Sequence, residues 1–243
     1  EGGMSFAPTT GTAAVPDWPG PSVRAGMSRD VPLLIGTNEH EAYFMAIADP
    51  RLRGDAPDID HADLLHRLEP GVDGDLEALV AHYREAHPEH SRFETLLTIE
   101  SEAFRVRSIR LAEDKAGAEG AAPTFHYLFR RTASKIPQAR SYHGLEMGFV
   151  FDNLAETMRF TLADEGSEEL AREMSARWAA FARTGRPDVD GLPEWEPFDA
   201  ESRRTMEIDQ GWEMTTDPLG EDRAAWSDVP LGPSTRPWSR VAG

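Results

Sequence analysis

The segment from Val31 to Ile35 most narrows the range of folds open to this chain. It is apolar on both faces of the strand that it would form, which is typical of a strand buried inside a parallel sheet. Pro32 lies near its start, where a missing N–H group is tolerated. Parallel strands need crossover connections, which are usually helices. We therefore expect an α/β fold with a mostly parallel sheet flanked by helices.

The rest of the chain alternates between predicted strands and predicted helices. Residues 124–130, which are dense in aromatic side chains, and residues 204–209 are the other predicted strands. Four amphipathic stretches are predicted to be helices. Each follows a residue that favours a helix N-terminus: Asp60, Asp75, Ser91 or Ser167. The third stretch should run to about Ala118, and a short last helix is expected over residues 218–226. Residues 1–30, which are rich in proline, are expected to form a loop.

The composition excludes several classes of protein. A formal net charge of −18 over 243 residues opposes a nucleic-acid partner, because phosphate binding needs clustered lysine and arginine. The absence of cysteine excludes disulfides and thiolate chemistry. No apolar run approaches the ~20 residues of a membrane helix, and no signal peptide is visible, so we expect no membrane partner and favour a cytoplasmic location. The chain begins without Met, which indicates that it starts inside a longer one.

Two loops carry residues that could work together in catalysis. The first runs from Gly36 to Glu41 and places acids just after the predicted strand, at the edge where parallel sheets form ligand crevices. The second contains His143, in a turn of small residues ahead of an apolar segment. A carboxylate that accepts the Nδ1–H of a histidine holds the ring in one tautomer, as in Ser-His-Asp triads. Spacing alone does not choose between Glu39 and Glu41, and no Gly-x-Ser-x-Gly motif supplies a nucleophile.

Two further groups of histidines are candidate metal ligands. The segment from His87 to His90 is interrupted by Pro88, and the pair His61 and His66 is spaced so that the two rings lie on different helix faces. The His-x₃-His spacing of helical zinc sites is absent. We expect no metal and no cofactor.

The two catalytic-type loops resemble those of the type-B carboxylesterase family, which includes bacterial para-nitrobenzyl esterases and the cholinesterases. In that family a strand is followed by Gly-Thr-Asn-x-x-Glu-Gly, whose Glu is the triad acid, and residues 36–41 match this motif with Glu41 as the acid. Ala42 replaces the last glycine. The family's histidine loop, His-Gly-x-Glu-x-x-Phe-Val-Phe-x-Asn-Leu, matches residues 143–154, with Gly148 in place of a common proline. The resemblance extends to about residue 226.

This resemblance implies the carboxyl-terminal half of an α/β-hydrolase, with residues 1–243 forming part of a single domain. Glu41 would be the triad acid and His143 the base, acting on a small-molecule ester. The serine nucleophile and the oxyanion loop would come from the amino-terminal portion of the same esterase, either as a separate chain or as part of a nicked precursor. Without that portion we expect neither a self-sufficient domain nor hydrolysis at an enzymatic rate.

Two other interpretations were considered. One is a non-catalytic, cholinesterase-like binding module, since some relatives keep the fold and lose the triad. Retention of both Glu41 and His143 argues against it. The other is an unrelated acidic α/β domain, which the length of the histidine-loop match makes improbable.

Overall fold

The computed structural model describes residues 10–44, 58–69, 72, 74–157 and 166–230. The strands are β1 (Leu33–Asn38), β2 (Thr124–Phe129), β3 (Arg204–Ile208) and β4 (Trp212–Thr216). The α-helices are α1 (Pro19–Arg24), α3 (His61–Leu68), α4 (Leu76–Ala86), α5 (Arg92–Ala116), α6 (Met147–Val150), α7 (Leu154–Thr157), α8 (Ser167–Thr184) and α9 (Gly220–Ala225). In the part of the chain that the structure describes, the short 3₁₀ helices are η1 (Glu41–Tyr43) and η3 (Pro137–Ala139).

The strands form one mixed sheet in the order β1-β2-β3-β4. The β1–β2 and β2–β3 pairs are parallel, and β3–β4 is an antiparallel hairpin. The register pairs Leu33 with Thr124 at one end of β1 and Asn38 with Phe129 at the other. The first two strands therefore finish level with each other, and the loops that follow them leave from the same edge of the sheet.

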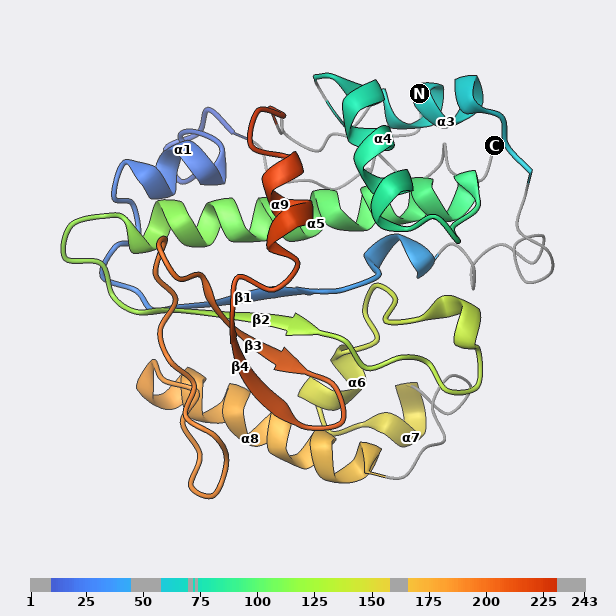
Figure 1. Ribbon diagram of the computed structural model, residues 1–243. Coiled ribbons are helices and arrows are strands. Elements are labelled where there is room, and N and C mark those ends of the chain that lie inside the picture. The colour runs from blue at the N-terminus through green and yellow to red at the C-terminus, as the bar shows by residue number, and fades with distance from the viewer. Residues whose placement is uncertain (1–9, 45–57, 70–71, 73, 158–165, 231–243) are drawn as a thin grey trace.

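Helices cover both faces of the sheet, as expected for an α/β fold (Figure 1). The long helix α5 lies against β1 and β2 and also contacts α1, α3, α4 and α9. On the opposite face, α8 packs with α6. None of the helices in the described part of the chain has both the length and the apolar character that crossing a membrane requires.

Large aromatic side chains fill the core on both faces. Trp195 and Trp226 are fully buried. The Trp195 indole N–H donates to the carbonyl of His126 over 3.2 Å, and that of Trp226 donates to the Tyr83 hydroxyl over 2.9 Å. A buried indole needs such a partner, because an unsatisfied donor costs free energy. These bonds fix the last part of the chain against β2 and α4.

Three of the predicted helix N-caps are confirmed. The Asp60 carboxylate accepts from the Asp63 N–H over 2.8 Å, and that of Asp75 accepts from Ala78 over 3.0 Å. Ser91 forms a reciprocal capping box with Glu94. Each cap supplies an acceptor to an N–H group that has no partner inside its helix.

Other expectations were wrong in detail. Ser167 does not cap α8: it is the first helical residue, and Gly166 is the N-cap, with a φ of 85°. Residues 1–30 were expected to be loop, but Pro19–Arg24 form α1, whose Pro at the first turn suits a helix start. Strand β4 was not expected at all. It pairs with β3 across a tight turn, and its pairing depends on contacts that lie outside its own sequence.

Gly36 is required where β1 passes β2 most closely. It pairs with Tyr127, and a Cβ atom added at Gly36 would lie 2.3 Å from the Tyr127 carbonyl oxygen and 2.4 Å from its ring Cγ. Both are far inside van der Waals contact, and the carbonyl belongs to a paired strand that cannot move freely. The site therefore accepts no side chain without a shift of the β1–β2 pair.

We expect Gly36→Ala to lower the free energy of unfolding by about 3 kcal/mol, the upper range for overpacking a core. Urea denaturation of the purified protein measures this change. Gly211→Ala is the matched control, because a Cβ at Gly211 meets no atom within 4 Å. Equal stabilities of the two variants would contradict the close approach of β1 and β2.

Candidate active site

Glu41 lies three residues after the end of β1, and the last residue of that strand binds its side chain. It opens the 3₁₀ helix η1, and its side chain is only 7% exposed. One carboxylate oxygen, Oε1, accepts from the backbone N–H of Asn38 over 2.8 Å. The other, Oε2, lies 2.6 Å from Nδ1 of His143. The buried carboxylate therefore has a partner for each oxygen, which offsets the cost of removing its charge from water.

The loop that follows β2 brings His143 to this carboxylate. The Ser141 hydroxyl donates to the carbonyl of Phe129, at the end of β2, over 2.7 Å. The His40 N–H donates to the Ser141 carbonyl over 3.1 Å, and the His143 N–H donates to the Glu41 carbonyl over 3.3 Å. Gly144 then adopts a φ of +83°, a conformation that suits glycine and turns the chain after the histidine.

Asn38 and Glu146 form a second link between the two loops. The Asn38 side-chain amide donates to the Tyr142 carbonyl over 2.7 Å and to Oε2 of Glu146 over 2.6 Å. Burial raises the pKa of Glu146, and the Asn38 bond opposes this shift. The contact between Glu146 and Asn38 was not predicted from the sequence, although both residues stand in the two matched motifs.

The structure separates the two candidate acids. Glu39 is bound elsewhere, because it accepts two bonds from the Arg130 guanidinium, over 2.9 and 3.1 Å. His40, between the two acids, is largely buried, and this burial lowers its pKa to about 4. Ala42, where the family usually has glycine, lies in η1 outside the positive-φ region, so its methyl group causes no backbone strain.

The His143 imidazole is placed to exchange a proton. Its side chain is 54% exposed, while its Nδ1 faces the buried Glu41. The hydrogen bond to Glu41 raises the pKa of His143, and the charges of Glu41 and Glu146 act in the same direction against the effect of burial. When the neutral ring donates from Nδ1, Nε2 is left as the acceptor. The pair can therefore act as a general base with its acid partner in place.

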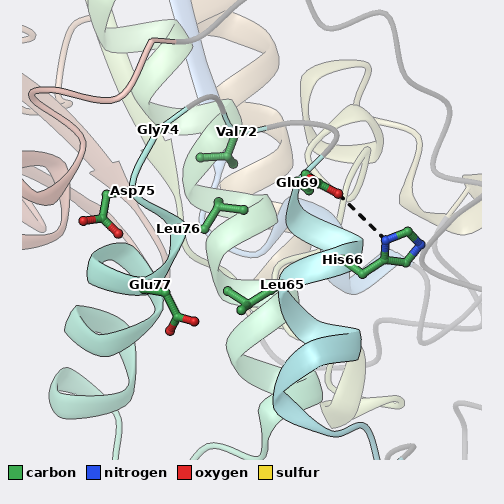
Figure 2. A pocket seen from close by; sticks show the side chains of 8 residues that line it. All are labelled: Leu65, His66, Glu69, Val72, Gly74, Asp75, Leu76 and Glu77. Carbon is green, nitrogen blue, oxygen red and sulfur yellow. Dashed lines mark ion pairs between the residues drawn. The ribbon is translucent and has the colours of Figure 1, made fainter.

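The other chemically notable groups lie apart from this pair. His126 is buried in β2 between Ser108 and Thr205, and burial lowers its pKa to about 3. A pocket lies between α3 and α4, and no residue of the two loops lines it (Figure 2). Its volume is about 620 Å³. Its lining residues are Leu65, His66, Glu69, Val72, Gly74, Asp75, Leu76 and Glu77.

Because Glu41 raises the pKa of His143, Glu41→Gln should lower that pKa. The amide oxygen can still accept from Nδ1, but the negative charge that stabilises the imidazolium is gone. NMR titration of the imidazole signals measures the change.

Two neighbouring acids serve as controls. Glu39→Gln should leave the pKa of His143 in place, because Glu39 is bound to Arg130. Glu146→Gln should lower it less than Glu41→Gln does, because Glu146 acts on the ring through its charge alone. A pKa that is unchanged or higher in Glu41→Gln would contradict the geometry.

Several known proteins are similar to this chain. The profile of the Carboxylesterase family matches residues 1–226. The chain is 28% identical over 228 residues to the para-nitrobenzyl esterase of Bacillus subtilis (strain 168). This alignment covers 90% of this chain and 42% of that protein. It is 26% identical over 248 residues to the acetylcholinesterase of Danio rerio, with 83% and 39% covered.

Solved structures give the same result. The carboxylesterase EST55 of Geobacillus stearothermophilus superposes with a TM-score of 0.74 at 27% identity, over 88% of this chain and 44% of that one. The chain thus spans about two fifths of the length of these relatives. Because the family profile covers nearly the whole sequence, the chain belongs to the carboxylesterase family.

Proposed function

We propose that this chain supplies the acid and the base of a serine carboxylic-ester hydrolase that acts on small-molecule esters. Glu41 is the acid and His143 the base. The 2.6 Å contact between Oε2 of Glu41 and Nδ1 of His143 is the observation that carries the proposal. The names of the relatives support the reaction class, since a para-nitrobenzyl esterase and a carboxylesterase are among them.

In this mechanism Nε2 of His143 accepts the proton of a serine hydroxyl as the serine oxygen attacks the ester carbonyl. His143 then returns that proton to the leaving alcohol, and an acyl-serine remains. Water attacks the acyl-serine with His143 again as the base, which releases the acid. Glu41 stabilises the imidazolium in both steps and keeps Nδ1 as the donor.

The serine and the oxyanion hole belong, in this proposal, to an amino-terminal portion of the same domain. Among the described residues β1 pairs only with β2, so its outer edge is open to a further strand. Two apolar side chains just after His143 are exposed, Met147 by 52% and Phe151 by 74%. The relatives are more than twice as long as the matched region. An amino-terminal portion would cover these surfaces and complete the sheet.

His143→Ala in the enzyme that contains both portions should reduce kcat by roughly 10⁵-fold, because serine and histidine act as a unit. Glu41→Gln should cost less, roughly 10³-fold, since the base remains but its tautomer is no longer fixed. Initial rates with para-nitrophenyl esters measure both effects, and thermal melting checks that the variants fold.

His66→Ala is the matched control, because its exposed side chain lies on α3, outside the two loops. It should keep the parent kcat. His126 is unsuitable for this purpose, since its removal would take away a buried hydrogen-bond partner of Ser108 and of Thr205. Turnover of His143→Ala within tenfold of the parent would refute the mechanism. A parent enzyme that hydrolyses no ester would favour the binding-module interpretation.

A further inference from the structure

The connection between α4 and α5 gathers three side chains that can bind a metal ion. His87, Glu89 and His90 each place a ligand atom within 4.8 Å of the others. Oε1 of Glu89 lies 3.9 Å from Nδ1 of His87 and 3.5 Å from Nε2 of His90. The two imidazoles are stacked, with ring centroids 4.7 Å apart and planes 10° from parallel. From the sequence, this segment was expected to hold no metal, because Pro88 interrupts it.

The backbone holds the two histidines on the same side of the connection. His87 is the C-cap of α4, and its N–H donates to the Tyr83 carbonyl inside that helix over 3.0 Å. The His90 N–H donates to the His87 carbonyl over 3.0 Å, so the segment forms a closed turn. Pro88 restricts the backbone inside that turn, and Ser91 begins α5 directly after it. Proline therefore shapes this group rather than disrupting it.

The His90 ring is oriented so that Nε2 is presented to Glu89. Nδ1 of His90 lies 3.5 Å from the Thr98 hydroxyl, which leaves Nε2 facing Glu89. Such a bond from the second ring nitrogen is the usual way in which a metal-binding imidazole is oriented. The His90 side chain is only 8% exposed and that of His87 33%, whereas Glu89 is 68% exposed and can move toward an ion.

We propose that His87, Glu89 and His90 form a binding site for a divalent transition metal such as Zn²⁺. With bonds of about 2.0–2.1 Å, ligand atoms in a tetrahedral zinc site lie roughly 3.3 Å apart. The separations of 3.5 and 3.9 Å are close to this value and need a small rotation of Glu89. Lone pairs of imidazole lie in the ring plane, so the stacked rings must also turn about their Cβ–Cγ bonds to share an ion.

The chemistry of the three groups selects the metal. Two imidazoles and one carboxylate suit zinc, nickel or copper, whereas calcium and magnesium prefer oxygen ligands. Three protein ligands leave a fourth position for water. Because neither Glu41 nor His143 takes part, the metal site does not depend on the esterase mechanism proposed above.

Equilibrium dialysis of the tag-free enzyme that contains both portions against Zn²⁺ tests the site. We expect one zinc ion to be bound, and we expect His87→Ala and His90→Ala each to weaken its binding by at least roughly 100-fold. Glu89→Gln should weaken it less, because an amide oxygen can remain a ligand. Substitution with Co²⁺ should give the intense visible absorption of a tetrahedral site, and His90→Ala should abolish that absorption.

His61→Ala is the matched control. His61 also faces a glutamate, with Nε2 2.9 Å from Oε2 of Glu77, but it is outside the three-ligand group. Its replacement should leave zinc binding unchanged. The proposal fails if the parent protein binds no zinc, or if a His87→Ala/His90→Ala double variant that keeps its circular dichroism spectrum binds zinc as tightly as the parent.

Discussion

The parallel pairing of β1 with β2 is the constraint on which the candidate active site depends. Its register pairs Asn38 with Phe129. The loop that carries Glu41 and the loop that carries His143 therefore begin side by side at one edge of the sheet. Glu41 and His143 are 102 positions apart in the chain, yet their side chains meet at 2.6 Å. A slip of the pairing would move both loops relative to each other and reverse the faces of the strand. Gly36 permits the close approach of β1 to β2 in this register, because it has no side chain to meet Tyr127.

Polar bonds then convert proximity into a fixed geometry. The carboxylate of Glu41 is buried, and its two oxygens are satisfied by the Asn38 N–H and by the His143 ring. A buried charge without such partners would be costly. The Asn38 side chain and Glu146 join the same two loops a second time, so the histidine cannot move without breaking bonds on both sides. The His143 side chain stays half exposed beside this buried pair of loops, as the proposed base would need to be.

Much of this arrangement could be predicted from the sequence, and the exceptions have physical causes. Caps such as Ser91 are local signals, and the pattern of Val31 to Ile35 identified a sheet strand. The choice of Glu41 over Glu39 came from a family motif, because spacing could not make it. The structure gives the reason: Arg130, which is distant in sequence, binds Glu39. Strand β4 was missed because it forms by pairing with β3. The His87–His90 group is local in sequence, but the turn that brings its side chains together could not be inferred from the residue types alone.

In our proposal this chain holds the base, and the nucleophile lies in another portion of the enzyme. Labelling of the enzyme that contains both portions with a fluorophosphonate, followed by peptide mass spectrometry, locates the nucleophile. We expect one modified serine outside residues 1–243, and no labelling in the His143→Ala variant. A modified serine within residues 1–243, or labelling that persists without His143, would contradict it.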